Sequence, residues 1–194
     1  MSVARSSAVR SRLEVLRSIS VVASLGLLLS SMLVGCGTTV ARRDPTGELF
    51  PTVMGESLTG ASVTLPTEWS GEPVLLLVGY EQDSQFDIDR WLLGITESKL
   101  SINMVEVPTI PGWGASMASN FINNGMRSGI PEEDWRSVVC VYEEAMEIVR
   151  FTGNENPLPG RILLLDKDGK VIFFHDRGYS VGTLQKLREK LGSE

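Results

Sequence analysis

The sequence predicts an α/β fold, namely a three-layer sandwich around a mixed central sheet, preceded by a signal peptide and a flexible tether. Two observations predict the sandwich. A strand, a helix and a second strand follow one another early in the folded region, and a hairpin followed by a helix closes the chain. The first arrangement supplies parallel strands and the second supplies antiparallel ones, so one sheet is expected to hold both.

The N-terminal segment has the layout of a secretory signal peptide. Its basic front contains Arg5, Arg10, Arg12 and Arg17, and an apolar run then extends over residues 19–34. This order is typical of exported proteins. The apolar run is interrupted by serines and is shorter than the roughly 20 residues that a membrane-spanning helix needs. A permanent span is therefore the weaker interpretation.

Leu33-Val34-Gly35-Cys36 resembles the lipobox of bacterial lipoproteins. In that family the cysteine sulfur receives a diacylglyceryl group, and the leader is cut immediately before it. The resemblance implies a signal peptide at residues 1–35 and a lipidated Cys36. Residues 37–48 contain almost no apolar side chains and are expected to be a flexible tether, so that the tether with its lipidated cysteine covers residues 36–48. An ordinary thiol near a cleavage site is the alternative for Cys36.

Lipid on Cys36 would keep the protein in the cell envelope, facing the periplasm or the cell exterior, because several acyl chains bind a membrane much more firmly than one. Gly37 is not the aspartate that retains many Gram-negative lipoproteins in the inner membrane. By that resemblance the outer membrane is slightly favoured.

Charge excludes one class of partner. Without the leader's four arginines and one glutamate, 14 basic and 23 acidic residues remain, a net charge of about −9. Nucleic-acid binding depends on lysine and arginine side chains that neutralise phosphates, so no nucleic-acid partner is expected.

The chain has two cysteines, Cys36 and Cys140. If lipid occupies the first, no intramolecular disulfide can form, and the exported domain must rely on its hydrophobic core. Residues 49–194 have the length of one domain.

The first half of the domain is expected to begin with a small hairpin at residues 58–65 and a buried central strand at residues 74–79. Polar residues at 80–84 can cap the helix that follows. One face of that helix carries Ile88, Trp91, Leu92 and Ile95.

The second half predicts strands at residues 101–107 and 137–142, and helices at residues 117–126 and 143–151, the latter closed by Gly153. Residues 162–165 and 171–174 flank a turn at 166–169 and predict a hairpin. A last helix, capped by Ser180, carries an apolar stripe of Leu184, Leu187 and Leu191. The thioredoxin fold has this order of elements.

Thioredoxin-like redox chemistry would lie on the loop after the first central strand, where the N-terminus of the following helix stabilises a thiolate. That loop, residues 80–86, contains no cysteine. Glu81, Asp83 and Asp87 are expected to cap the helix and have no predicted catalytic role. Gly160 stands where redox members of the fold carry a cis-proline. No catalytic residues are therefore predicted.

Cys140 lies in the apolar stretch Val138-Val139-Cys140-Val141, which predicts a buried structural cysteine. The alternative is a nucleophile of a one-cysteine thiol oxidoreductase or peroxidase, activated by the single histidine, His175, if the fold brings the two together. His175 is more simply interpreted as a solvated strand end. One histidine does not make a metal site without cysteine help, so no metal or cofactor is predicted.

The middle of the chain resembles the mitochondrial assembly chaperones of ATP synthase, the ATP-ten family. The resemblance is most specific at residues 124–133, followed by Gly-Asn-Glu-Asn at 153–156 and by Gly160. Members of that family are thioredoxin-like without redox cysteines and help the membrane-embedded a subunit enter its complex. It implies a membrane-associated protein client here. The lipoprotein setting departs from the family, so the client need not carry over.

The possible partner-binding residues are Asn120, Asn123, Asn124, Arg127 and Asn156. The first four recur at helical spacing on residues 117–126 and just beyond, and Asn156 is expected to join Arg127 in a polar patch. A solvated helix face with an asparagine-rich cap is the alternative. Trp113 is expected to be exposed on a loop.

The leading hypothesis is a lipid-anchored, non-redox thioredoxin-like protein, not an enzyme, that binds or assists assembly of a membrane-associated protein complex. The one-cysteine enzyme using Cys140 is the rival. An envelope lipoprotein with only a scaffolding role is a third possibility.

Overall fold

The computed structural model describes residues 39–192, so the predicted signal peptide and the predicted lipid attachment at Cys36 lie outside it. The central sheet has the strand order β4-β3-β6-β7. β4 (Asn103–Pro108) runs parallel to β3 (Val74–Gly79), whereas β6 (Arg161–Leu165) is antiparallel to both β3 and β7 (Val171–His175). The sheet is mixed, which confirms the predicted architecture.

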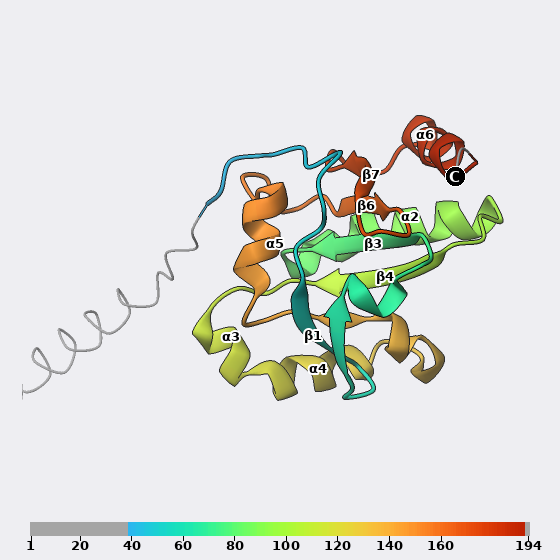
Figure 1. Cartoon of the computed structure of the whole chain (residues 1–194). Helices are drawn as coiled ribbons and strands as arrows, with labels where there is room; N and C mark the ends of the chain where they lie inside the picture. The colour runs from blue at the N-terminus through green and yellow to red at the C-terminus, as the bar shows by residue number, and fades with distance from the viewer. Residues whose placement is uncertain (1–38, 193–194) are drawn as a thin grey trace, which may run out of the picture. The chain divides into compact units, whose positions relative to one another are not determined.

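Helices cover both faces of this sheet (Figure 1). Side chains of β3 alternate between the faces: Leu75 and Leu77 pack with α2 and α6, whereas Leu76 and Val78 pack on the side of α5. All six β3 residues are buried, as expected of a strand covered on both sides. The described helices are α2 (Gln85–Glu97), α3 (Trp113–Met117), α4 (Ser119–Arg127), α5 (Ala145–Thr152), α6 (Val181–Leu191) and the 3-10 helices η2 (Thr67–Trp69), η3 (Gln82–Ser84) and η4 (Glu132–Ser137).

A second sheet has the order β2-β1-β5. β1 (Val53–Ser57) and β2 (Ser62–Leu65) form the first hairpin, so its first strand lies earlier than the predicted 58–65. β5 (Val139–Cys140) is shorter than the predicted strand at 137–142 because it pairs with β1 over two residues only. Isolated bridges from Val138 to Glu106 and from Val141 to Thr109 link this segment to β4.

The closing elements confirm the local signals. Asp166 Oδ1 accepts hydrogen bonds from the backbone N–H groups of Asp168 and Lys170, which shapes the β6–β7 turn. Gly169 there has a φ of 80°, in the left-handed region that favours glycine. Ser180 caps α6 by accepting a hydrogen bond from the backbone N–H of Thr183.

Residues 39–48 correct the predicted tether, because they pack on the domain. Val40 donates its N–H to Asn154 Oδ1 at 2.7 Å, and Arg43 donates its N–H to the carbonyl of Thr152 at 3.2 Å. The guanidinium of Arg42 forms a two-pronged ion pair with the buried carboxylate of Asp176, at 2.7 and 3.0 Å. The packed domain therefore begins at Thr39 and not near Leu49.

The predicted helix at 117–126 is displaced and divided. α3 begins at Trp113, Ala118 interrupts the helical path, and α4 continues to Arg127. Trp113 is exposed, as predicted, but it starts a helix. Across residues 39–192, no helix combines the length and apolar character needed to cross a bilayer.

Candidate functional site

The start of α2, where thioredoxin-like redox chemistry would lie, is occupied by a network of hydrogen bonds. Glu81 and Ser84 form a capping box, and the Ser84 hydroxyl also donates to the carbonyl of Pro157 at 3.0 Å. We call this region the α2 junction; it comprises residues 80–87, residues 153–161 and the side chains that bind them.

Asp87 lies in the first turn of α2 and does not cap it, which corrects the prediction. Its carboxylate accepts hydrogen bonds from the backbone N–H of Gly160, at 3.0 Å, and of Tyr179, at 2.7 Å. It therefore joins α2 to the segments before β6 and before α6. A Cβ atom on Gly160 would lie 3.0 Å from Ile88 Cγ1, so the close approach of this loop to α2 favours glycine.

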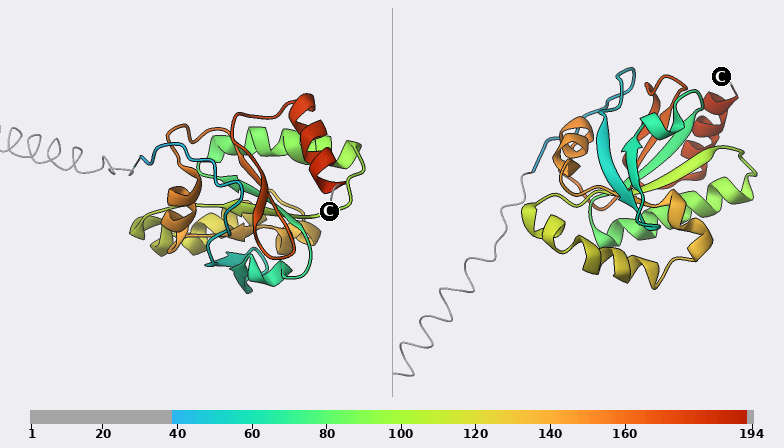
Figure 2. Two further views of the ribbon diagram at one scale, coloured as in Figure 1. Left: turned by 45° about the horizontal axis from the view of Figure 1, so that its top comes forward. Right: turned by 60° about the horizontal axis from the view of Figure 1, so that its bottom comes forward.

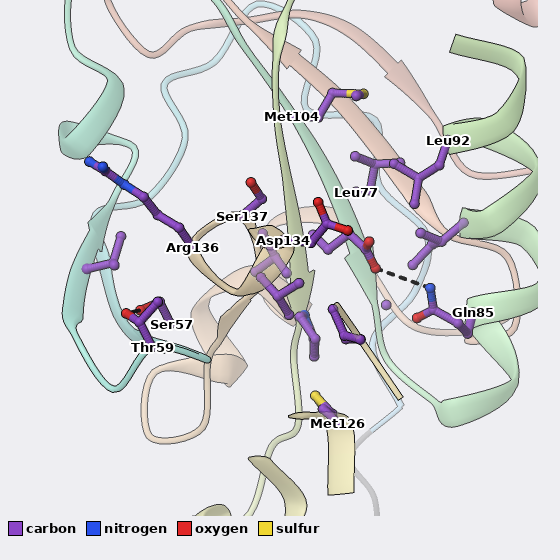
Figure 3. A pocket seen from close by; sticks show the side chains of 18 of the residues that line it. Ser57, Thr59, Leu77, Gln85, Leu92, Met104, Met126, Asp134, Arg136 and Ser137 are labelled. Atoms are coloured by element: carbon purple, nitrogen blue, oxygen red, sulfur yellow. Dashed lines mark hydrogen bonds between the residues drawn. The ribbon is translucent and has the colours of Figure 1, made fainter. Parts of the chain in front are cut away.

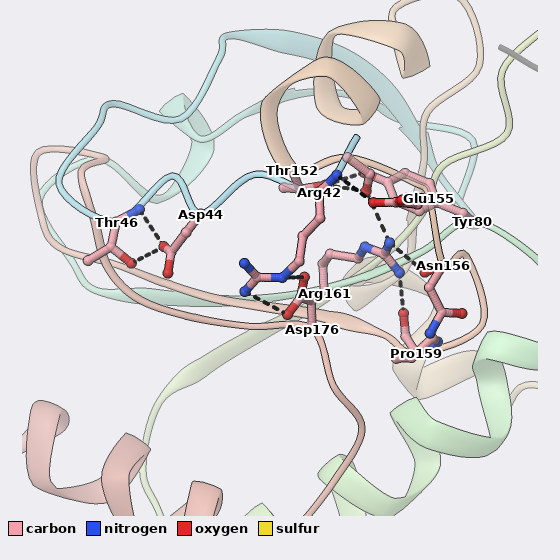
Figure 4. Close-up of polar contacts among 11 residues, drawn as sticks. Arg42, Asp44, Thr46, Tyr80, Thr152, Glu155, Asn156, Pro159, Arg161 and Asp176 are labelled. Atoms are coloured by element: carbon pink, nitrogen blue, oxygen red, sulfur yellow. Dashed lines mark hydrogen bonds and ion pairs between the residues drawn. The ribbon is translucent and has the colours of Figure 1, made fainter. Parts of the chain in front are cut away.

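Arg161 is 2% exposed and holds the adjacent loop in place (Figure 4). Its guanidinium donates to the carbonyls of Pro159 at 2.6 Å, Gly153 at 3.0 Å and Asn156 at 2.7 Å. It also lies 4.8 Å from the centre of the Tyr80 ring, a cation–π contact. Burial lowers the pKa of Arg161 from its usual value.

Tyr80 completes the α2 junction from β3. Its hydroxyl donates to the carbonyl of Ile148 at 3.1 Å and shares a hydrogen bond with the hydroxyl of Thr152 at 2.5 Å. Burial raises the pKa of Tyr80 to about 12, so the phenol is neutral near pH 7. These side chains use their hydrogen-bonding groups on the protein's own backbone, which makes the α2 junction structural.

Cys140 is buried, as the sequence predicts, with 1% of its surface exposed. Its sulfur lies 3.7 Å from that of Met126. Burial raises the pKa of the Cys140 thiol to about 11, so very little thiolate is present at neutral pH.

His175 is engaged elsewhere. Its Nε2 bonds the carbonyl of Gly178 at 2.8 Å, and its ring lies 5.8 Å from that of Trp91. It is half-buried, not a solvated strand end. Within residues 39–192, no group of three histidine, cysteine, aspartate or glutamate side chains is placed to hold a metal ion.

Two of the predicted partner-binding residues support the fold, which corrects their assignment. Asn123 is buried; its Oδ1 accepts from the hydroxyl of Tyr142 at 2.6 Å, and its Nδ2 donates to Glu56 at 3.2 Å. Arg127 donates from Nε to the carbonyl of Leu58 at 2.6 Å. Asn123 is consequently unavailable to a partner, and Arg127 is largely committed to the hairpin.

The other three predicted residues, Asn120, Asn124 and Asn156, are exposed. Asn124 accepts a hydrogen bond from Arg127, whereas the carbonyl of Asn156 accepts one from Arg161. No hydrogen bond or ion pair joins Arg127 to Asn156 in the described part of the chain. The predicted polar patch of these two residues is therefore not formed.

A surface groove of about 1870 Å³ runs beside β4. Figure 3 shows Gln85 and Leu92 of α2 on one side of it and Ser57, Thr59 and Arg136 on the other. We call it the β4 groove. Its volume exceeds the roughly 300–1,000 Å³ of typical small-molecule pockets.

Glu106 lies in the β4 groove and was not predicted as a site residue. Gln85 donates a hydrogen bond to its carboxylate at 3.2 Å. Burial raises the pKa of Glu106, and the negative charges of Asp89 and Asp134 raise it further, whereas the Gln85 hydrogen bond lowers it. A glutamate between the two valines of a predicted strand was the available signal, but the sequence does not tell which carboxylates the fold brings beside it.

The β4 groove is strongly acidic. One cation, Arg136, lines it, and it is 3.9 Å from Glu68. The carboxylates that line the groove are those of Glu68, Glu72, Glu81, Asp89, Glu106 and Asp134. A positively charged partner segment would complement this surface.

The architecture described above is a thioredoxin-like fold, as solved structures show. Copper-bound yeast Sco1 matches with a TM-score of 0.56 and 15% identity, over 78% of this chain and 96% of that one. A candidate protein disulfide isomerase from Bacteroides thetaiotaomicron matches with a TM-score of 0.53 and 13% identity, over 80% and 95%. A thiol peroxidase from Chromobacterium violaceum matches with a TM-score of 0.50 and 12% identity, over 80% and 92%.

No protein-family model matches the sequence, and no curated protein matches it significantly. At these identities the structural likeness extends to the fold alone.

Proposed function

We propose that this protein is a lipid-anchored, non-redox thioredoxin-like module that binds a membrane-associated protein and assists its assembly. The observation that carries the proposal is the β4 groove, which is large, acidic and open, while the α2 junction is filled by its own hydrogen bonds. The resemblance to the ATP synthase assembly chaperones and the lipobox at Cys36 support the client class and the setting.

The β4 groove favours an extended, positively charged client segment. One edge of β4 pairs with β3. On the other edge, Val138 bridges to Glu106 and Val141 donates its N–H to the carbonyl of Pro108, and within residues 39–192 no strand pairs with Asn103 or Met104 there. An exposed strand edge can bind an extended peptide through its backbone groups. The surrounding carboxylates would favour lysine or arginine in that peptide.

Several features disfavour redox or copper chemistry. The loop at residues 80–86 has no thiol, and Cys140 is buried with a raised pKa. Copper is bound in proteins by cysteine, methionine or histidine donors. Cys140 is buried with Met126 beside it, and the single histidine, His175, bonds the carbonyl of Gly178 instead. The copper of the Sco1 neighbour therefore does not extend to this chain.

Site-specific photocrosslinking in intact membranes tests the proposal. A photoreactive residue at position 59 or 137, both exposed on the β4 groove, should crosslink one membrane-associated protein. The same residue at position 185, exposed on α6, is the matched control. Charge reversal by Asp134→Arg should reduce the groove crosslinks several-fold, because it opposes a cationic client.

Equal crosslinking from positions 59, 137 and 185, or crosslinks indifferent to Asp134→Arg, would contradict binding in the β4 groove. The rival function, a one-cysteine thiol enzyme using Cys140, predicts instead that Cys140 is alkylated in the native protein as fast as an exposed thiol. Its burial makes us expect alkylation only after unfolding.

A further inference from the structure

Three large apolar side chains form an exposed row on the outer side of α3 and α4. Trp113, Met117 and Phe121 follow one another at intervals of four residues and are 81%, 78% and 84% exposed. Single exposed apolar residues are ordinary on protein surfaces, but a row of three with this exposure marks an interaction surface. We call this row the outer stripe.

The residues of the outer stripe are not the ones with which α3 and α4 pack on the domain. The inward side of the same helices carries its own apolar residues, Ala115, Ile122 and Met126, which pack against the buried cluster around Cys140. α3 and α4 are thus apolar on two sides, and only the inner side is covered by the domain.

The segment of sequence that carries the outer stripe is unusually free of charge. Residues 109–131 contain no aspartate or glutamate, although the chain has 24 acidic residues. Their one charged residue, Arg127, turns its Nε to the carbonyl of Leu58. Tryptophan and phenylalanine with uncharged polar neighbours suit the interface between lipid headgroups and acyl chains.

α3, the helix that carries Trp113 and Met117, lies on the side of the domain where the described chain begins. In Figures 1 and 2, the first described residues and α3 lie on the same side of the domain in every view. This entry point is fastened, because Val40 exchanges hydrogen bonds with Asn154 through the N–H of each residue. From Cys36 to Thr39 the chain spans at most about 10 Å.

We propose that the outer stripe docks into the headgroup region of the membrane that holds Cys36, so that Trp113, Met117 and Phe121 contact lipid. This inference rests on the lipid anchor of the proposed function and adds a fixed orientation to it. The short, fastened connection keeps the entry side of the domain next to the bilayer. The acidic β4 groove is then left for the protein client.

Spin labelling of the full-length, membrane-extracted protein in phosphatidylethanolamine and phosphatidylglycerol vesicles tests this orientation. Met117→Cys introduces an exposed thiol, while Cys140 is buried and Cys36 would be blocked by lipid. Gln185→Cys on α6 is the control. The label at position 117 should collide several-fold more with oxygen, relative to a water-soluble nickel chelate, than the label at position 185. Adding Phe121→Asp should return position 117 to the control ratio.

A label at position 117 that is as accessible to nickel as the control would overturn the inference. The inference would also be overturned if the label is accessible to oxygen and to the nickel chelate in vesicles but shielded from both in native membranes. In that case the outer stripe would be a protein interface. Mass spectrometry of the N-terminus and vesicle sedimentation separate the two proposals. Lipidated, sedimenting protein with a water-exposed label contradicts docking alone, whereas unmodified, soluble protein contradicts the anchor and docking together.

Discussion

The α2 junction and the β4 groove adjoin at the start of α2, where Glu81 and Gln85 belong to both, yet the two regions differ in how their other polar groups are used. At the α2 junction, Asp87 and Arg161 bind backbone groups from distant segments. In the β4 groove, the Glu106 carboxylate accepts a hydrogen bond from Gln85 and feels the negative charges of Asp89 and Asp134. The start of α2 is thus held by the protein's own hydrogen bonds, and the adjoining groove is where we propose that a client binds.

The largest expected effect comes from removing the cation of the α2 junction. Arg161→Ala should lower the free energy of unfolding by about 3 kcal/mol, because one buried and two partly buried carbonyl groups lose a charged donor. Urea unfolding measures this change. Arg150→Ala, which removes an exposed arginine paired with Glu147, should change it by about 0.5 kcal/mol or less. Equal effects would show that the α2 junction is not a structural network.

A smaller effect is expected from the carboxylate of the α2 junction. Asp87→Asn should cost about 1–2 kcal/mol, since an amide cannot accept both backbone N–H bonds through two oxygens. Asp83→Asn removes a similar charge near the same helix from an exposed position, so it controls for the interaction with the helix N-terminus. If the melting temperature falls equally in Asp87→Asn and Asp83→Asn, the loss of stability comes from charge near the helix N-terminus and not from the hydrogen bonds to Gly160 and Tyr179.

The smallest expected effect is a pH-dependent increase in thermal stability when the Glu106 carboxylate of the β4 groove is removed. The pKa of Glu106 is raised in the folded state, so its ionisation opposes folding, and this penalty grows as the pH rises from the unfolded pKa through the folded one. Glu106→Gln should therefore raise the melting temperature slightly at pH 7 and leave it unchanged below about pH 4. Exposed Glu97→Gln should show no such pattern. A loss of stability at pH 7 would mean that the Glu106 carboxylate is better paired than its neighbours suggest.

Local patterns predicted the elements that pack through their own periodicity. Ile88, Trp91 and Ile95 recur at helical spacing and form the buried face of α2, and Asp166 with Gly169 specifies the last turn. β1 escaped prediction because Gly55 interrupts its pattern. A Cβ there would lie 2.6 Å from Val139 Cγ1, so the glycine reflects a contact with a segment more than 80 residues away.

The prediction that residues 37–48 are a flexible tether was wrong for residues 39–48 for a similar reason. The polar composition of this segment is real, but its partners, Asn154 and Asp176, lie more than 110 residues further along the chain. Helical spacing alone also could not tell which side of α4 would be buried, so Asn123 was grouped with exposed neighbours. The β4 groove is lined by residues from many separate elements, among them β2, α2, β4 and η4, and no single stretch of sequence reveals that they meet.

If Cys36 is lipidated as proposed, the fastened entry segment also affects how the domain could be released from the membrane. Arg42 and Arg43 are the first basic residues after Cys36 and would be the first sites for a trypsin-like protease. The side chain of Arg42 is held by Asp176, and Arg43 lies over the ring of Phe151 at 5.6 Å. A protease needs an accessible, extended segment, so cleavage here requires residues 39–48 to detach first. Resistance to shedding is thus set by the folding stability of ten residues.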